Sequence, residues 1–258
     1  MLLVIDCGNT NIVLAVYDGD RLSGHWRTAT EGEKTSDDYG VWFSQVMQRD
    51  GLKRDDIDAA IVSSVVPSKN NALRSMCSEF FNTEARFIGD SELDLGLTVL
   101  MQNPREVGDD RLVNAIAAQE SYGGPLIIID FGTATTFDVV DQDGNYAGGV
   151  IAPGINLSME ALHMAAALLP RIPVENPGQA PVVGTSTVAA MRSGVFWGYI
   201  GLIEGLVARI QEERNRGMTV IGTGGLASLF ATSTQVIDHT DDDLTLRGLR
   251  IVHERNSQ

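Results

Sequence analysis

The stretch LLVIDCGNTNIVLAVYDG at residues 2–19 returns in similar form as LIIIDFGTATTFDVVDQDG at residues 126–144. In each copy an apolar run ends at an acid, Asp6 or Asp130, turns at a glycine followed by small polar residues, and continues as a second apolar run. The copies begin about half a chain apart, which indicates that a whole domain is repeated. Because strands, glycine-rich turns and helices alternate in both halves, the sequence predicts an α/β protein of two related domains.

Each polar turn has the residue types of a phosphate site. Gly8 allows a tight turn, and residues 9–11 add side-chain donors beside exposed backbone N–H groups. Asp6 suits a hydrated Mg²⁺, because this hard cation prefers carboxylate oxygen and keeps several waters. A single turn of this kind is more often a hairpin whose polar side chains satisfy the local backbone. Two copies instead favour a nucleotide held between two like domains.

The composition excludes some classes of partner. The chain has 258 residues and a formal charge of −15, which argues against nonspecific binding to nucleic acid or to an anionic membrane. The N-terminal MLLVIDCG lacks a basic leader and is expected to be a buried strand, so a cytoplasmic protein is predicted. The longest strongly apolar run, residues 195–203, is far shorter than the roughly 20 residues of a membrane span. Cys7 and Cys77 are expected to be buried, reduced thiols.

Hydrophobic periodicity and stop signals place the main helices. They are predicted at about residues 35–50, 68–82, 111–122, 156–168 and 187–213. Of the three hydroxyl residues Thr185, Ser186 and Thr187, one is expected to cap the last of these helices. Four glycines recur on that helix at three- and four-residue spacing, which indicates close contact with another helix, in the same chain or in a second copy (Gly194, Gly198, Gly201 and Gly205).

The segment MQNPREVGDDR at residues 101–111 gathers charges around Gly108 at a helix start. One interpretation is an acidic N-terminal turn with solvated side chains. The other is that one aspartate is a general base and Arg111 grips an anionic substrate with its planar fork. Residue chemistry alone leaves the two interpretations about even.

Two common nucleotide motifs do not occur. There is no G-x-x-x-x-G-K-[ST] phosphate loop. The negative charge of bound phosphates is therefore expected to be neutralised by metal ions, backbone amides and an arginine or Lys34. There is also no G-x-G-x-x-G after a strand, which weakens a nicotinamide interpretation.

Eight motifs in order resemble the type III pantothenate kinase family across residues 2 to about 255: DCGNTN, KTSDDYG, NPREVGDDR, DFGTATTFD, GGVIAPG, LPRI, GTSTVAAMRSG and TGGLA. The resemblance implies two tandem ribonuclease-H-like domains of the actin-like/sugar-kinase superfamily, with limits of 1–117 and 118–258, and ATP in the cleft between them. It implies phosphorylation of pantothenate, the first step of coenzyme A biosynthesis. It also implies a homodimer that needs Mg²⁺ and a monovalent cation, K⁺ or NH₄⁺.

The resemblance also assigns roles to residues. Asp110 matches the catalytic base, Asp130 a ligand of the monovalent cation, and Asp6 lies at the Mg²⁺–phosphate end. The ATP-binding residues are expected to be Asp6, Cys7, Gly8, Asn9, Thr10, Asn11, Ile12, Val13 and Thr133. The pantothenate-binding residues are expected to be Met101, Gly108, Asp109, Asp110, Arg111 and Thr187.

Two positions depart from the family pattern. Asp109 stands where the family has Ala, which puts a charge beside the base and is expected to raise its pKa by repulsion. Met101 stands where many members have Tyr, so a substrate-side hydroxyl is missing. Two other functions stay open from the sequence: another small-molecule alcohol kinase of the superfamily, or a nucleotide-binding regulator that has lost catalysis.

Overall fold

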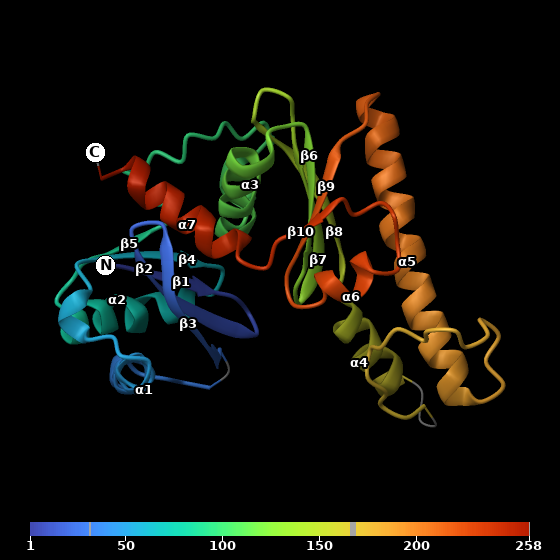
Figure 1. Ribbon diagram of the computed structural model, residues 1–258, viewed down its shortest axis with the longest axis horizontal. Coiled ribbons are helices and arrows are strands. Elements are labelled where there is room, and N and C mark those ends of the chain that lie inside the picture. Colours follow the sequence, from blue (N-terminus) through green and yellow to red (C-terminus); the bar gives the residue numbers. More distant parts are fainter. Residues whose placement is uncertain (31, 166–168, 258) are drawn as a thin grey trace. The chain divides into compact units, whose positions relative to one another are not determined.

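The computed structural model describes residues 1–30, 32–165 and 169–257. Its contacts divide the chain into two compact units, each with its own five-stranded sheet (Figure 1). The first unit comprises Met1–Leu97, Gln102–Ala117 and Asp243–Gln258, and the second comprises Thr98–Met101 and Ala118–Asp242. Domain limits of 1–117 and 118–258 stay a prediction.

The first sheet has the strand order β3-β2-β1-β4-β5. Its strands are β1 (Leu2–Cys7), β2 (Asn11–Asp18), β3 (Arg21–Ala29), β4 (Ala59–Ser64) and β5 (Ala85–Phe87). Strand β1 runs antiparallel to β2 and parallel to β4. The N-terminal run is therefore the central strand of a sheet, which explains why it is apolar almost throughout.

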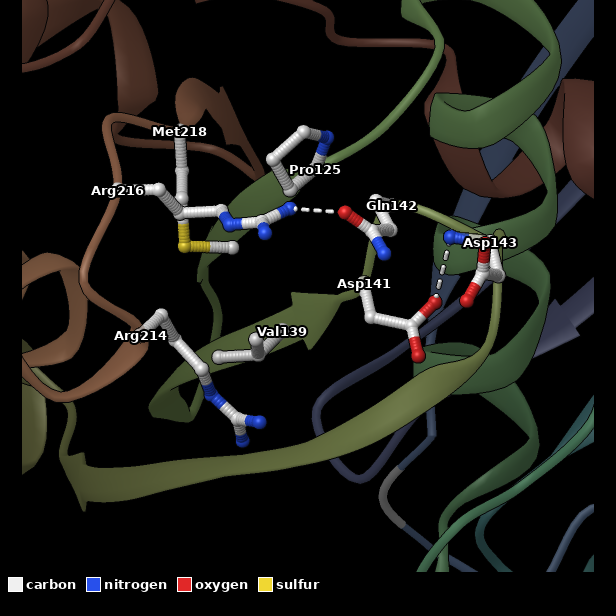
Figure 2. Close-up of a pocket in the computed structure, with 8 residues that line it drawn as sticks. All are labelled: Pro125, Val139, Asp141, Gln142, Asp143, Arg214, Arg216 and Met218. Atoms are coloured by element: carbon white, nitrogen blue, oxygen red, sulfur yellow. Dashed lines mark hydrogen bonds between the residues drawn. The ribbon is translucent and has the colours of Figure 1, made fainter.

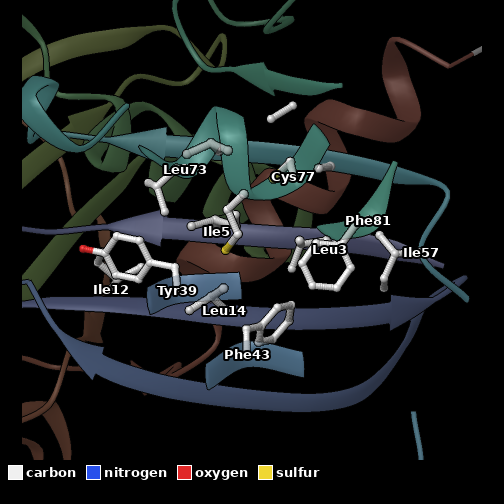
Figure 3. Close-up of a cluster of buried hydrophobic side chains, with 14 of the residues drawn as sticks. Leu3, Ile5, Ile12, Leu14, Tyr39, Phe43, Ile57, Leu73, Cys77 and Phe81 are labelled. Carbon is white, nitrogen blue, oxygen red and sulfur yellow. The ribbon is translucent and has the colours of Figure 1, made fainter. Parts of the chain in front are cut away.

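Helices α1 (Ser36–Arg49) and α2 (Pro67–Phe81) cover one face of this sheet (Figure 1). Buried side chains from the strands and both helices form one core, shown in Figure 3 (Leu3, Ile5, Leu14, Phe43, Leu73 and Phe81). Side chains alternate across a strand, so Val4 and Asp6 point to the opposite face. Helix α7 (Leu244–Arg255) contacts β1 and β4. The C-terminal helix thus groups with the first unit, because its buried leucines pack there.

The second sheet repeats the first in the order β10-β9-β6-β7-β8. Its strands are β6 (Leu126–Phe131), β7 (Ala134–Val140), β8 (Tyr146–Pro153), β9 (Thr219–Thr223) and β10 (His239–Thr240). Strand β6 runs antiparallel to β7 and parallel to β9, as β1 does to β2 and β4. The predicted α/β repeat is confirmed, strand for strand.

The helices of the second unit are α4 (Ile155–Ala165), α5 (Thr187–Arg214) and α6 (Ala227–Ala231). Aromatic and aliphatic side chains from β6, β7, α5 and α6 form its core (Ile127, Ile129, Phe137, Phe196, Tyr199 and Phe230). The predicted end of the fourth helix near residue 168 lies outside the described residues. Ser186 caps α5, since its side chain accepts a hydrogen bond from the Ala189 N–H at 3.2 Å.

The remaining helical elements are α3 (Asp109–Tyr122) and two 3₁₀ turns, η1 (Arg54–Asp56) and η2 (Pro104–Glu106). Helix α3 begins at Asp109, two residues before the predicted start at 111. Thr35 caps α1 in a reciprocal capping box with Asp38, which explains the polar TSDD at the helix start. Cys7 and Cys77 are buried and free, as predicted.

Candidate active site

The first polar turn joins β1 to β2 in the first unit. The Gly8 N–H donates to the Asn11 carbonyl at 3.0 Å, which closes the turn. Thr30, directly after β3, supports the turn, because its Oγ1 donates to the Gly8 carbonyl at 2.7 Å and its N–H to the Thr10 carbonyl at 3.0 Å. Asn9 and Thr10 are exposed. The sequence thus forms a fixed turn that presents polar groups to solvent, which a phosphate site requires.

The other residues predicted for this site divide by exposure. Asp6, Asn11 and Val13 are partly exposed, whereas Cys7 and Ile12 are buried in the core. Burial raises the pKa of the Cys7 thiol, so it stays protonated. Cys7 and Ile12 can therefore offer a ligand only their backbone groups.

Two lysines lie on the segments around this turn. Lys34 Nζ donates to Thr28 Oγ1 at 2.7 Å and to the Ala29 carbonyl at 3.0 Å. Lys69, in the first turn of α2, donates to the Gly32 carbonyl, and its charge acts to lower the pKa of Cys7. The sequence singled out Lys34 but missed Lys69. Its position two residues after Pro67, in the first turn of a helix, was the available signal.

The predicted substrate segment starts helix α3 in the same unit. Asp110 Oδ1 accepts a hydrogen bond from the Arg111 N–H at 2.9 Å. A Cβ placed on Gly108 would come within 2.6 Å of the same oxygen, so the carboxylate lies directly against this glycine. Only glycine leaves the Asp110 side chain in this position.

Asp109 binds a different element. Its Oδ2 accepts from the Ser64 N–H at 3.5 Å, at the end of β4. The Ser64 hydroxyl donates to Asn70 Oδ1 at 2.6 Å. The residue that departs from the family pattern thus links α3 to the end of the parallel strand beside β1.

Both aspartates have raised pKa values. Burial raises the pKa of Asp110, against the opposing effects of the Arg111 N–H and guanidinium. Burial also raises the pKa of Asp109 to about 6, and the charges of Asp110 and Asp90 add to the rise. The predicted repulsion is therefore felt chiefly by Asp109, whereas the pKa of Asp110 rises mainly because its carboxylate leaves water.

Replacing Asp109 with Asn is expected to change how stability depends on pH. Between about pH 4 and about pH 6 the folded protein keeps a proton at Asp109 that the unfolded chain has lost, so stability falls as pH rises. The Asn variant lacks this loss. The difference in free energy of unfolding, variant minus parent, is therefore expected to be larger at about pH 7.5 than at about pH 4. The increase is about 1–2 kcal/mol after allowance for solvent screening. Urea unfolding at both pH values measures this difference, and parallel curves would contradict the shifted pKa.

The second polar turn joins β6 to β7 in the second unit. The Gly132 N–H donates to the Ala134 carbonyl at 3.1 Å. The acceptor is two residues along the chain here, whereas it is three residues along in the first turn. Thr133 is exposed at its tip. A Cβ on Gly224 would lie 2.5 Å from Asp130 Oδ1, so the Asp130 carboxylate lies against the glycine turn that follows β9. This close approach explains why residue 224 is glycine.

Two other predicted residues belong to the second unit. Met101 ends a short segment whose backbone pairs with Tyr146, the Leu100 N–H donating to its carbonyl at 2.8 Å. Thr187 is exposed in the first turn of α5. The structure thus groups residues 6–13 with 108–111 in one unit, and Met101, Asp130, Thr133 and Thr187 in the other.

Neither of the two pockets described within the units is lined by a predicted site residue. One, of about 220 Å³, lies in the second unit and is shown in Figure 2. Pro125, which lines it, precedes β6, whereas Asp130 lies near the other end of that strand. Its lining includes Arg214 and Arg216, and Arg216 Nη1 donates to Gln142 Oε1 at 2.6 Å. The other, of about 740 Å³, lies in the first unit beside Arg74 and His253.

No described helix is long and apolar enough to cross a membrane. Across the described ranges, no three His, Cys, Asp or Glu side chains gather into a possible metal site.

Comparison with solved structures identifies the fold. The activator of the 2-hydroxyisocaproyl-CoA dehydratase from Clostridium difficile with bound ADPNP matches with a TM-score of 0.57 and 14% identity, covering 98% of this chain and 96% of that chain. The (R)-2-hydroxyglutaryl-CoA dehydratase component A from Acidaminococcus fermentans matches with a TM-score of 0.54 and 13% identity, covering 100% and 99%. At these identities the likeness shows the fold alone, and it is the predicted actin-like/sugar-kinase fold.

Sequence comparison identifies the family. The profile of type III pantothenate kinase matches residues 2–209. The type III pantothenate kinase of Paramagnetospirillum magneticum is 61% identical over 257 residues, which cover 100% of this chain and 98% of the relative. That of Rhodospirillum rubrum is 58% identical over 256 residues, covering 99% of each. The chain belongs to the type III pantothenate kinase family.

Proposed function

We propose that this chain transfers the γ-phosphoryl group of ATP to the primary hydroxyl of pantothenate, the first step of coenzyme A biosynthesis. The hydroxyl oxygen attacks the γ-phosphorus in line, the bond to the β,γ-bridging oxygen breaks, and ADP leaves. Asp110 accepts the hydroxyl proton. The observation that supports this role best is the half-buried Asp110 carboxylate with its raised pKa, fixed against Gly108 at the start of α3.

Pantothenate would be held by the residues around the base. Arg111 suits its carboxylate, because a guanidinium matches a carboxylate with two parallel hydrogen bonds. Gly108 and Asp109 complete this segment, and Thr187 and Met101 are assigned to pantothenate by the family motif. Because Met101 offers no hydroxyl, its contact with the substrate would be apolar.

ATP would bind to the two polar turns. The first turn offers backbone N–H groups and the side chains of residues 9–11, and Thr133 is the expected contact in the second. Asp6 fits a Mg²⁺ that keeps its waters and takes phosphate oxygens, since one carboxylate suffices for that mode. When bound, Mg²⁺ would neutralise charge on the phosphates. Asp130, against Gly224, offers one carboxylate to K⁺ or NH₄⁺, and carbonyls of the adjacent loops would supply the other ligands.

We also propose a homodimer that forms through helix α5. Three of its four repeated glycines, Gly194, Gly198 and Gly201, are exposed, and a Cβ on any of them would meet nothing within 4 Å. Their spacing predicted a close helix contact, either in the same chain or with a second copy, and the open space beside these glycines favours the second copy. Exposed apolar side chains of the same unit would add to that interface (Ile151, Leu157, Val182 and Val183).

Replacing Gly198 with Arg is expected to dissociate the dimer. The position is exposed in one copy, and arginine favours a helix more than glycine does, so the fold is retained. A bulky charge at a close helix contact prevents approach of the partner. Analytical ultracentrifugation would then give the monomer mass, with Gly217→Arg in an exposed loop as the control. A dimer of unchanged affinity would place the interface elsewhere.

The experiment that tests the proposed function is a substrate panel with ATP. Pantothenate and other hydroxylated small molecules are supplied in turn with Mg²⁺ and NH₄⁺, and ADP release is followed. We expect pantothenate to give the highest kcat/KM. A preference for another alcohol would favour the alternative kinase, and ATP binding without any turnover would favour a lapsed regulator. Because the reaction consumes ATP, the cytoplasm is the proposed location.

A further inference from the structure

The two acids at the strand ends share a neighbour that the sequence did not reveal. Asp6 on β1 is paired in register with Ser63 on the parallel strand β4. In the second sheet Asp130 on β6 is paired in the same way with Thr223 on β9. Strands β4 and β9 take the same place in the two sheet orders, so the repeat has a hydroxyl residue beside each acid.

The side chains of each pair lie on the same face of their sheet. Paired residues on neighbouring strands point the same way, and the strands are about 4.8 Å apart. The residues that precede Asp6 and Ser63, Ile5 and Val62, both belong to the core under α1 and α2, so this pair points to the opposite face. A serine hydroxyl at this separation is within hydrogen-bonding reach of a carboxylate.

Ser63 is unusual for a buried polar residue. Its side chain is 0% exposed, and in the described part of the chain its Oγ has no hydrogen-bond partner. Thr223 is 2% exposed. An unsatisfied buried hydroxyl reduces stability, so its presence calls for a reason other than folding. The next residue, Ser64, does not share this feature, because its hydroxyl donates to Asn70.

We propose that Ser63 is a positioning residue for Asp6. When ATP and Mg²⁺ bind, the Ser63 hydroxyl donates to the Asp6 carboxylate and holds it toward the cation and its waters. A carboxylate accepts about four hydrogen bonds, so this one adds to any that Asp6 already makes. Thr223 would act in the same way on Asp130. This inference rests on the proposed function, which puts Asp6 at the Mg²⁺–phosphate end.

The test is Ser63→Ala in the full chain, with ATP binding measured by calorimetry at a series of Mg²⁺ concentrations. We expect the Mg²⁺ concentration for half-maximal binding to rise about 10-fold, as for the loss of other hydrogen bonds to metal-binding carboxylates. We also expect the thermal midpoint to stay the same or rise, because the variant removes an unsatisfied hydroxyl. A purely structural role would lower the midpoint and leave the Mg²⁺ requirement unchanged. That result, or an unchanged requirement alone, would overturn the inference.

Two further variants make the test specific. Ser63→Thr keeps the hydroxyl, uses the residue type found at the corresponding place in the second repeat, and is expected to restore the Mg²⁺ requirement. Ser44→Ala removes a buried hydroxyl that already donates to the Gly40 carbonyl at 2.6 Å, and is expected to lower the midpoint without changing the requirement.

Asp6→Asn separates the inference from the proposed function. If this variant leaves the Mg²⁺ requirement unchanged, the cation is not at Asp6, and the part of the proposed function that assigns Mg²⁺ to Asp6 is wrong. If Asp6→Asn raises the requirement and Ser63→Ala does not, only the inference fails. If both raise it, the double variant is expected to show no further loss, because the two residues act as one unit.

Discussion

Replacing Asp110 with Asn is expected to lower kcat by about 10²–10⁴-fold, the usual contribution of a general base. Asn has nearly the same shape, and its oxygen can still accept the Arg111 N–H that Asp110 accepts at 2.9 Å. It has no basic oxygen to take the hydroxyl proton. The loss should therefore appear in kcat, while the Kd for ATP stays close to that of the parent.

The matched control is Asp109→Asn, the same change one residue earlier in the same helical turn. Asp109 also has a raised pKa, but its carboxylate accepts from the Ser64 N–H at the end of β4. This variant is expected to change KM for pantothenate more than kcat. If Asp109→Asn abolished turnover and Asp110→Asn did not, the two aspartates would have to exchange roles.

Replacing Gly154 with Ala is expected to weaken ATP binding at the second turn by about 10-fold or more. A Cβ at this position would lie 2.2 Å from the Thr133 carbonyl oxygen and 2.8 Å from that of Gly132. These are backbone atoms, so the turn itself must move. Overpacking of this kind costs about 1–3 kcal/mol, and about 1.4 kcal/mol corresponds to a tenfold change in affinity.

Calorimetry with ATP and thermal unfolding measure the two effects of this variant. Gly217→Ala is the control, because a Cβ there meets nothing within 4 Å. An unchanged ATP affinity together with a lowered thermal midpoint would show that the start of α4 moves and the turn does not. In that case the second turn would not be a close contact of the nucleotide.

The repeated strand, acid and glycine motif was sufficient to predict the α/β repeat. That motif depends on residues close together in the sequence, because an apolar run forms the central strand and a glycine after it permits the turn. The same reasoning predicted a cap among residues 185–187 and charged residues of α3 at a helix start. Both are short-range features, which sequence reasoning handles well.

Long-range features could not be predicted. The pairing of Asp6 with Ser63 depends on the register between strands far apart in the sequence. The approach of Gly154 to Thr133 and the grouping of α7 with the first unit depend on packing as well. The pKa of Asp109 was also out of reach, because burial contributes most to it and burial follows from the fold. The sequence indicated the residue types at the site but not which of them are buried together.

The most direct test of the proposed reaction is to follow both products with the unmodified chain. ATP, Mg²⁺, NH₄⁺ and pantothenate are mixed, ADP is measured by a coupled assay, and phosphorylated pantothenate by ³¹P NMR. We expect ADP and 4′-phosphopantothenate in equal amounts, and neither when pantothenate is omitted. ADP release at the same rate without pantothenate, or no phosphorylated pantothenate, would contradict phosphoryl transfer to this alcohol.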